Sequence, residues 1–177
     1  RGCTSLAKIS LPEGVTSIGM YAFSNCTSLA KINFPEGMEE IDLNAFSGCT
    51  ALAKITLPEG VTTITEWAFA DCTSLASVSL PTTLEVIEDH TFRGCTSLTS
   101  ITIPEGVTTI YEQAFEDCTS LTALNLPFSL EDFSDAFDAP EKNDIRLLVV
   151  PETLVGDAWA LAPNAVLVFA KQKDGQV

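Results

Sequence analysis

The sequence predicts a solenoid, a stack of about seven similar coils. The first observation is the spacing of the cysteines, each of which follows the previous one by 23 residues: Cys3, Cys26, Cys49, Cys72, Cys95 and Cys118. The second is that the units between them share one apolar pattern, without an insertion across the first five units. A period of roughly 20 to 50 residues is typical of solenoids and related arrays, in which repeats bury their apolar faces against their neighbours.

The composition is that of a folded, acidic protein. The 177 residues are 46% hydrophobic, and 9 Lys and Arg stand against 24 Asp and Glu, for a net charge of −15. This composition differs from that of disordered chains. Nucleic acids and anionic membrane surfaces attract clustered basic residues, so we expect neither as a partner. The longest apolar stretch, at residues 158–170, is interrupted by Pro163 and Asn164, so we expect no transmembrane segment.

Each unit begins with a predicted strand. In the first unit Ile9 and Leu11 alternate with Lys8 and Ser10, which is the period of a strand with one buried face. Pro12 then ends the strand. The Glu-Gly pair that follows predicts a turn, because glycine tolerates a positive φ.

The second half of each unit returns the chain to the core. Val15 and Ile18 are expected to point inward, and residues 19–23 are interpreted as a helical turn or a tight bend. Because stacked strands lie about 4.8 Å apart, equivalent residues form columns. One column is predicted to be a structural spine of phenylalanines: Phe23, Phe46, Phe69, Phe92 and Phe115.

The repeat resembles the 23-residue BspA-like leucine-rich repeat, the Treponema pallidum type. The residues that carry the resemblance include Leu29, Ile32, Pro35, Ile41, Ala45, Phe46 and Cys49, with counterparts in each unit. The resemblance implies an α/β repeat class, a right-handed leucine-rich-repeat solenoid with a parallel β-sheet. It also implies a binding or adhesion module. Family members are common on microbial and protist surfaces but not confined there, so an intracellular or organellar complex stays open.

The chain is expected to have two parts. Residues 1–140 contain the repeats, and residues 141–177 are expected to form a degenerate repeat and C-terminal cap, held partly by Trp159 and Phe169. Phe133 and Phe137 already depart from the register of the earlier units. Arg1-Gly2 matches the pair that precedes Cys95, so we expect further repeat sequence upstream.

The cysteines and the single histidine, which are residue types often used in catalysis, have non-catalytic interpretations here. The cysteines lack the close pairs of a zinc site, and side chains in one column point in parallel, whereas a disulfide needs facing Cβ atoms. We interpret the column as buried structural thiols: Cys26, Cys49, Cys72 and Cys95. His90, the single histidine, lies beside Glu88 and Asp89 and is interpreted as solvated. We expect no catalytic residue, no cofactor and no metal.

Two outward surfaces are candidate binding sites for a protein partner. Lys8, Lys31 and Lys54 form a basic column on the exposed side of the predicted strands, where like charges repel unless an acidic group is near. The alternative is a solubilising surface. A second column varies from coil to coil and contains aromatic types that are favoured in binding hot spots. It is called the bend column below: Tyr21, Asn44, Trp67, His90 and Gln113. The alternative interpretation is that the variation along this column is ordinary sequence divergence between repeats.

The predicted function is a non-enzymatic scaffold for protein–protein interaction or adhesion. Two alternatives stay open, a structural or peripheral subunit of a larger assembly and an accessory region of an enzyme that acts on polysaccharide.

Overall fold

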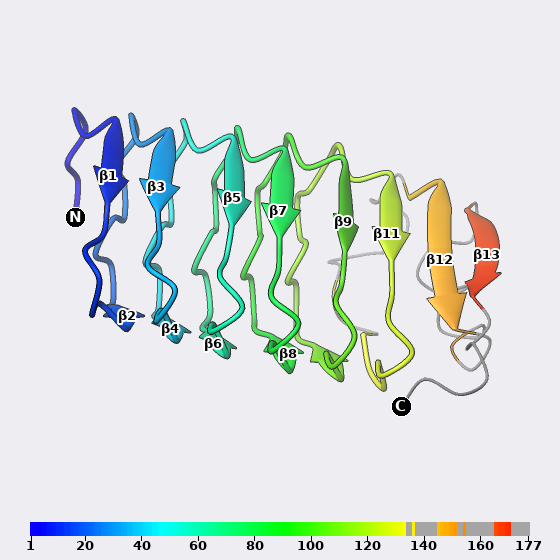
Figure 1. The fold of residues 1–177 in the computed structure, drawn as a ribbon. Helices are drawn as coiled ribbons and strands as arrows, with labels where there is room; N and C mark the ends of the chain where they lie inside the picture. Colours follow the sequence, from blue (N-terminus) through cyan, green and yellow to red (C-terminus); the bar gives the residue numbers. More distant parts are fainter. Residues whose placement is uncertain (134–135, 137–144, 152–153, 155–164, 171–177) are drawn as a thin grey trace.

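The protein is a solenoid of parallel strands, as the sequence predicts (Figure 1). The computed structural model describes residues 1–133, 136, 145–151, 154 and 165–170. Trp159 and Phe137, as well as most of the predicted cap over residues 141–177, lie outside the described residues. The prediction of a cap therefore stays a prediction.

Each of the first six coils contributes a three-residue strand to one face of the solenoid. These strands are β1 (Lys8–Ser10), β3 (Lys31–Asn33), β5 (Lys54–Thr56), β7 (Ser77–Ser79), β9 (Ser100–Thr102) and β11 (Ala123–Asn125). The longer strands β12 (Leu147–Pro151) and β13 (Val166–Ala170) continue the face. Pairing is parallel and in register, as in the pair Ile9 and Ile32. The central residue of each three-residue strand points inward and its neighbours point outward, because side chains alternate along a strand.

A second set of two-residue strands lies along one edge of the solenoid (Figure 1). It contains β2 (Ser17–Ile18), β4 (Glu40–Ile41), β6 (Thr63–Ile64), β8 (Val86–Ile87) and β10 (Thr109–Ile110). The inward isoleucine of each pair is buried.

The main sheet is interrupted in two places. β1 pairs with β3, β5 pairs with β7, and β9, β11, β12 and β13 form a four-stranded sheet, but β3 is not hydrogen-bonded to β5, nor β7 to β9. The first interruption coincides with Phe34, which stands where the other coils have leucine or isoleucine. Its ring packs edge-on against Phe46, with the centroids 6.2 Å apart. We attribute the first interruption to this larger side chain; nothing in the structure explains the second.

The segment after each short strand is a tight bend and not a helix. In the first coil the N–H groups of Ala22 and Ser24 donate within the coil, whereas those of Tyr21 and Phe23 donate to carbonyls of the next coil. An α-helix would direct all of these groups along its own axis. The described part of the chain accordingly contains no α-helix. The predicted leucine-rich-repeat solenoid is confirmed, with bends rather than helices between its strands, because the coils require these donors for stacking.

The phenylalanine column forms a stack through the core. Successive rings are nearly parallel, with centroids 5.3 to 5.7 Å apart and interplanar angles of 10° or less. Phe46, Phe69, Phe92 and Phe115 are buried, while Phe23 in the first coil is half-buried. The stack gives each coil the same inward anchor.

The cysteine column lies beside the phenylalanine column and joins consecutive coils. All six cysteines are free, and all except Cys3 are buried. The Sγ atoms of Cys49, Cys72, Cys95 and Cys118 each donate to a phenylalanine carbonyl of the preceding coil, at 3.1 to 3.3 Å. Burial raises the pKa of the Cys49 and Cys118 thiols to about 12, so these thiols remain protonated donors.

We expect Phe69→Ala to lower the free energy of unfolding by about 3–5 kcal/mol, because it removes a buried ring that stacks on both sides. Phe23→Ala is the matched control and should cost less, since Phe23 is half-buried and stacks on Phe46 alone among the described rings. Urea unfolding followed by circular dichroism measures both. An equal loss at the two positions would contradict a stack that gains stability from burial.

We expect a thiol reagent to label only Cys3 rapidly in the native protein, because the other five cysteines are buried. Mass spectrometry of the labelled protein identifies the sites. In denaturant all six cysteines should react, which controls for the reagent. Rapid native labelling at any buried position would show that the column is open to solvent.

We expect the protein to lose stability as the pH rises from about 9 toward 12. The ordinary thiol pKa is 9.0, whereas folding raises that of Cys49 to about 12. The unfolded thiol therefore releases its proton first, so the free energy of unfolding is at its full value below pH 9. It then falls by about 1.4 kcal/mol per pH unit for each such thiol. Urea titrations across this range measure the slope, which should be shallower in Cys49→Ala. An unchanged slope in that variant would contradict the burial of this thiol.

Candidate functional site

All five residues of the bend column have a left-handed backbone. Their φ angles lie between 53° and 60° for Tyr21, Asn44, Trp67, His90 and Gln113. This conformation costs roughly 1–2 kcal/mol for residues other than glycine, with asparagine among the better tolerated. Tyrosine and tryptophan are disfavoured in the left-handed conformation when only the backbone is considered. We therefore look to the contacts of their side chains for an explanation of the strain.

A second left-handed column, four residues further along each coil, shows what the backbone alone prefers. Its members are Asn25, Gly48, Asp71, Gly94 and Asp117, with φ angles from 56° to 72°. These are glycine or short polar residues, the types that tolerate positive φ. The coil geometry thus imposes the conformation at both columns, but only the bend column combines it with large side chains.

The central part of the bend column is a packed ladder across three coils. The rings of Trp67 and His90 stack face to face, with centroids 4.1 Å apart and an interplanar angle of 5°. His90 Nε2 lies 2.7 Å from Gln113 Oε1, so the two side chains share a hydrogen bond. All three side chains are half-buried. His90 is therefore packed between neighbouring coils and is not solvated as predicted, and its Nδ1 is buried without a partner among the described residues.

Arg93 borders this ladder and is held in place by acidic groups. Its guanidinium lies 5.6 Å from the centre of the Trp67 ring, a cation–π arrangement. The same group forms an ion pair with Glu116 and lies 3.8 Å from Asp71 and 3.6 Å from Asp117. Trp67 is thus positioned by contacts with two residues of the next coil, His90 and Arg93.

The remaining surroundings of the bend column are partly apolar and partly acidic. Arg1 lies over the ring of Tyr21, 5.1 Å from its centre. Met20 and Tyr111 are 55% and 45% exposed. Partial burial raises the pKa of Glu88, and the nearby negative charges of Glu66 and Asp89 raise it further.

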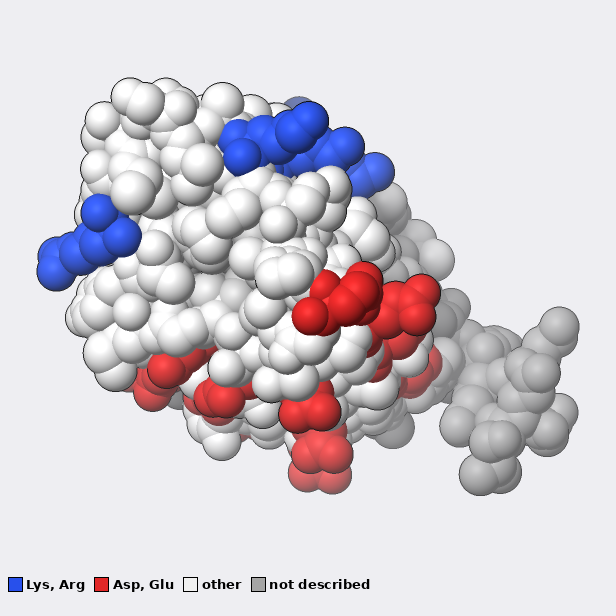
Figure 2. Space-filling view, turned by 60° about the vertical axis from the view of Figure 1, so that its left-hand side comes forward, with Lys and Arg blue, Asp and Glu red and all other residues white. Residues whose placement is uncertain are grey.

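The basic column lies on the outward side of β1, β3 and β5. Lys8, Lys31 and Lys54 are exposed, and Lys8 is directly opposite Lys31 in the parallel register. Among the described residues, none of these three lysines takes part in an ion pair. Figure 2 shows Lys and Arg side chains on parts of the surface separate from the acidic side chains, which gather elsewhere in that view.

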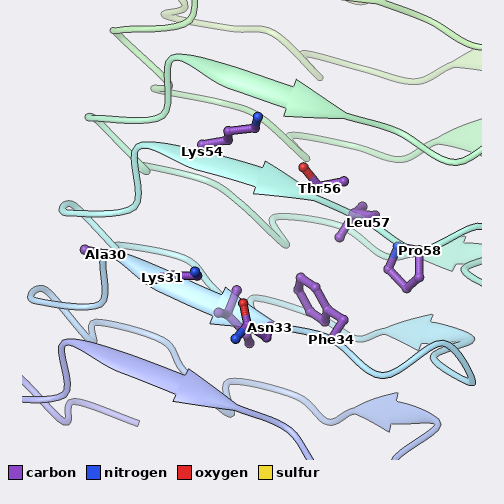
Figure 3. A pocket seen from close by; sticks show the side chains of 9 residues that line it. Ala30, Lys31, Asn33, Phe34, Lys54, Thr56, Leu57 and Pro58 are labelled. Atoms are coloured by element: carbon purple, nitrogen blue, oxygen red, sulfur yellow. The ribbon is translucent and has the colours of Figure 1, made fainter.

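A groove of about 520 Å³ lies between β3 and β5, at the first interruption of the sheet (Figure 3). It is called the β3/β5 groove below, and it is lined by Ala30, Lys31, Ile32, Asn33, Phe34, Lys54, Thr56, Leu57 and Pro58. The structure therefore brings two residues of the basic column to one groove. Lys8 is not among its lining residues.

A second hollow of about 550 Å³ is lined by residues of the third, fourth and fifth coils. Its polar groups are largely engaged within the protein. The Thr82 N–H and hydroxyl both donate to Glu59, which lowers the pKa of that carboxyl, and the Thr83 hydroxyl bonds backbone carbonyls. This hollow is therefore a weaker candidate than the β3/β5 groove.

No group of three or more potential metal ligands is assembled within residues 1–133 or the shorter described segments. The described residues also include no helix with the length and hydropathy needed to cross a membrane.

Sequence reasoning identified both columns but missed Arg93 and Phe34. Phe34 carried a usable signal, since it is the one aromatic residue at a position that is otherwise leucine or isoleucine. Arg93 carried a weaker signal in the sequence, because its contact with Trp67 depends on the orientation of two side chains that are 26 residues apart.

The comparisons with known proteins agree with this geometry. The chain matches the family described as BspA type leucine rich repeat region, in six copies over residues 1–122 and 68–147. No functionally curated protein matches it.

Similar solved structures include leucine-rich repeat proteins from three bacteria. The protein from Bacteroides ovatus ATCC 8483 is 34% identical, with a TM-score of 0.65 over 86% of this chain and 45% of its own. The T. pallidum protein TpLRR is 28% identical, with a TM-score of 0.68 over 93% and 87%. The protein from Eubacterium ventriosum ATCC 27560 is 26% identical, with a TM-score of 0.69 over 73% and 35%. This chain thus spans less than half of the first of these proteins. The repeat, the parallel solenoid and these matches together show that the chain belongs to the BspA-type leucine-rich repeat family.

Proposed function

We propose that the protein is a non-enzymatic scaffold that binds another protein through the bend column. One observation carries this proposal: tyrosine and tryptophan occupy left-handed positions that glycine or asparagine would occupy at lower cost. Strain of this kind is often found at functional sites, where a required side chain outweighs the backbone preference. Family membership supports a binding role, because a regular solenoid presents an extended surface.

The packing of the bend column supports recognition of a protein. Trp67 is held between coils by His90 and Arg93, so its side chain loses little conformational freedom when a partner binds. Half-buried Trp and Tyr beside an Arg are the residue types most often found at the centre of protein interfaces. Exposed Met20 and Tyr111 add apolar area at either end of the column.

The test replaces Trp67 with asparagine, the residue that the second coil already has at this position as Asn44. We expect Trp67→Asn to weaken partner binding roughly 30-fold, the effect of losing a hot spot of about 2 kcal/mol. The thermal midpoint should change little. The lost ring stacking of about 0.5–1.5 kcal/mol is offset because asparagine tolerates the left-handed backbone. Tyr21→Asn should act in the same direction.

The partner for this test is isolated on the wild-type protein, purified and measured by titration calorimetry. Ser77→Asn is the matched control, since it places the same side chain on the outward face of β7. Equal affinity of the partner for wild type and Trp67→Asn would overturn the role of the bend column. A large fall in the thermal midpoint of Trp67→Asn would assign this residue to stability.

A further inference from the structure

The interruption between β3 and β5 leaves backbone groups without their usual partners. Between the first two coils the Leu11 N–H donates to the Asn33 carbonyl at 3.0 Å. The equivalent bond across the interruption would join the Phe34 N–H to the Thr56 carbonyl, and it is missing. Within the described structure the Phe34 N–H has no protein acceptor. Thr56 and Phe34 both line the β3/β5 groove.

A second ladder bond is missing at the other end of the same strands. The Ala30 N–H donates to the Ala7 carbonyl at 2.9 Å, and the Ala76 N–H donates to the Ala53 carbonyl at 2.9 Å. The corresponding bond from Ala53 N–H to the Ala30 carbonyl does not form in the part of the chain that the structure describes. The groove therefore offers a backbone donor at Phe34 and backbone acceptors at Ala30 and Thr56, and unsatisfied groups of this kind favour an external partner.

The side chains give the groove a cationic end and an apolar end. Figure 3 shows Lys31 and Lys54 toward the start of β3 and β5, and Phe34, Leu57 and Pro58 toward the other end of the groove. Among the described residues neither lysine has an ion-pair partner. In a chain with a net charge of −15, this is an isolated site for a negative group.

These features select the chemistry of the occupant. A side-chain carboxylate would accept hydrogen bonds from both lysines. An adjoining backbone would accept from the Phe34 N–H and donate to the Thr56 carbonyl, and a neighbouring apolar side chain would cover Phe34. An acidic peptide supplies all of these groups in sequence, whereas a sulfated polysaccharide supplies only the negative charge and hydroxyls.

We propose that the β3/β5 groove binds an acidic, partly apolar segment of a partner protein, with a carboxylate between Lys31 and Lys54 and an apolar side chain against Phe34. This inference rests on the proposed function as a protein-binding scaffold and adds a surface that shares no residue with the bend column.

The test uses a fluorescein-labelled peptide of alternating glutamate and leucine, with alternating glutamine and leucine as the neutral peptide. Fluorescence anisotropy measures binding to the full chain. We expect the acidic peptide to bind more tightly than the neutral one, and Lys31→Gln and Lys54→Gln each to weaken it about tenfold. Lys8→Gln is the matched control and should have a small effect, because Lys8 belongs to the same column but does not line the groove.

The Phe34→Leu variant distinguishes binding in the groove from simple charge attraction to the lysines. This variant keeps every lysine and removes the larger side chain to which we attribute the first interruption, so the missing ladder bonds should form and the groove should close. We expect peptide binding to fall about tenfold without loss of thermal stability.

Four results would overturn the proposal. They are the absence of peptide binding, equal effects of Lys8→Gln and Lys31→Gln, unchanged binding in Phe34→Leu, and tighter groove-dependent binding of a sulfated oligosaccharide than of the acidic peptide. Trp67→Asn should leave peptide binding unchanged. The peptide assay needs no natural partner. A negative result for the proposed function of the bend column can therefore be distinguished from a negative result for the β3/β5 groove.

Discussion

The hydrogen bonds between consecutive coils are the constraint on which the rest of the structure depends. A single coil has no internal ladder, so its backbone groups must be satisfied by the coils on either side. This requirement makes the bend direct alternate N–H groups to the next coil, and it imposes the two left-handed positions in each coil. It also places equivalent residues directly above one another, which produces the phenylalanine stack and the chain of thiol-to-carbonyl bonds. Core packing and backbone pairing therefore support the same coil spacing.

Much of this arrangement could be predicted from the sequence, because an unbroken period of 23 residues requires equivalent coils. The columns, the inward face of the strands and the two candidate surfaces follow from that period. Three features could not be predicted. The sequence of the bend is also compatible with a helical turn, because tyrosine is not a residue type that indicates the positive φ found at Tyr21. The packing of His90 depends on the orientation of the Trp67 ring one coil away. The glycine of the Pro-Glu-Gly turn has a positive φ at Gly14 and Gly106 but not in the two units between them that share this motif.

The interruption between β3 and β5 could not be predicted for a related reason. A leucine and a phenylalanine are both apolar, so Phe34 marks a departure from the other coils in the sequence without showing that the strands separate there. The difference lies in volume. The coils are closely packed, so an inward side chain that is too large for its layer pushes the adjacent strands apart. Overpacking of this kind shifts the backbone. The outcome depends on whether the neighbouring Phe46 ring can accommodate it edge-on, which the structure shows and a single sequence does not.

Both candidate surfaces arise where coils differ from one another, and the third coil contributes to both. It supplies Lys54 to the β3/β5 groove and Trp67 to the bend column. A regular array of identical coils would present the same surface at every step and could not select one position along a partner. Departures from the repeat remove that ambiguity, and the shared core keeps them rigid. Phe69 lies between Phe46 and Phe92 in the stack, so the third coil is anchored on both sides. The regular interior therefore allows two irregular surfaces to hold a defined spacing along the solenoid.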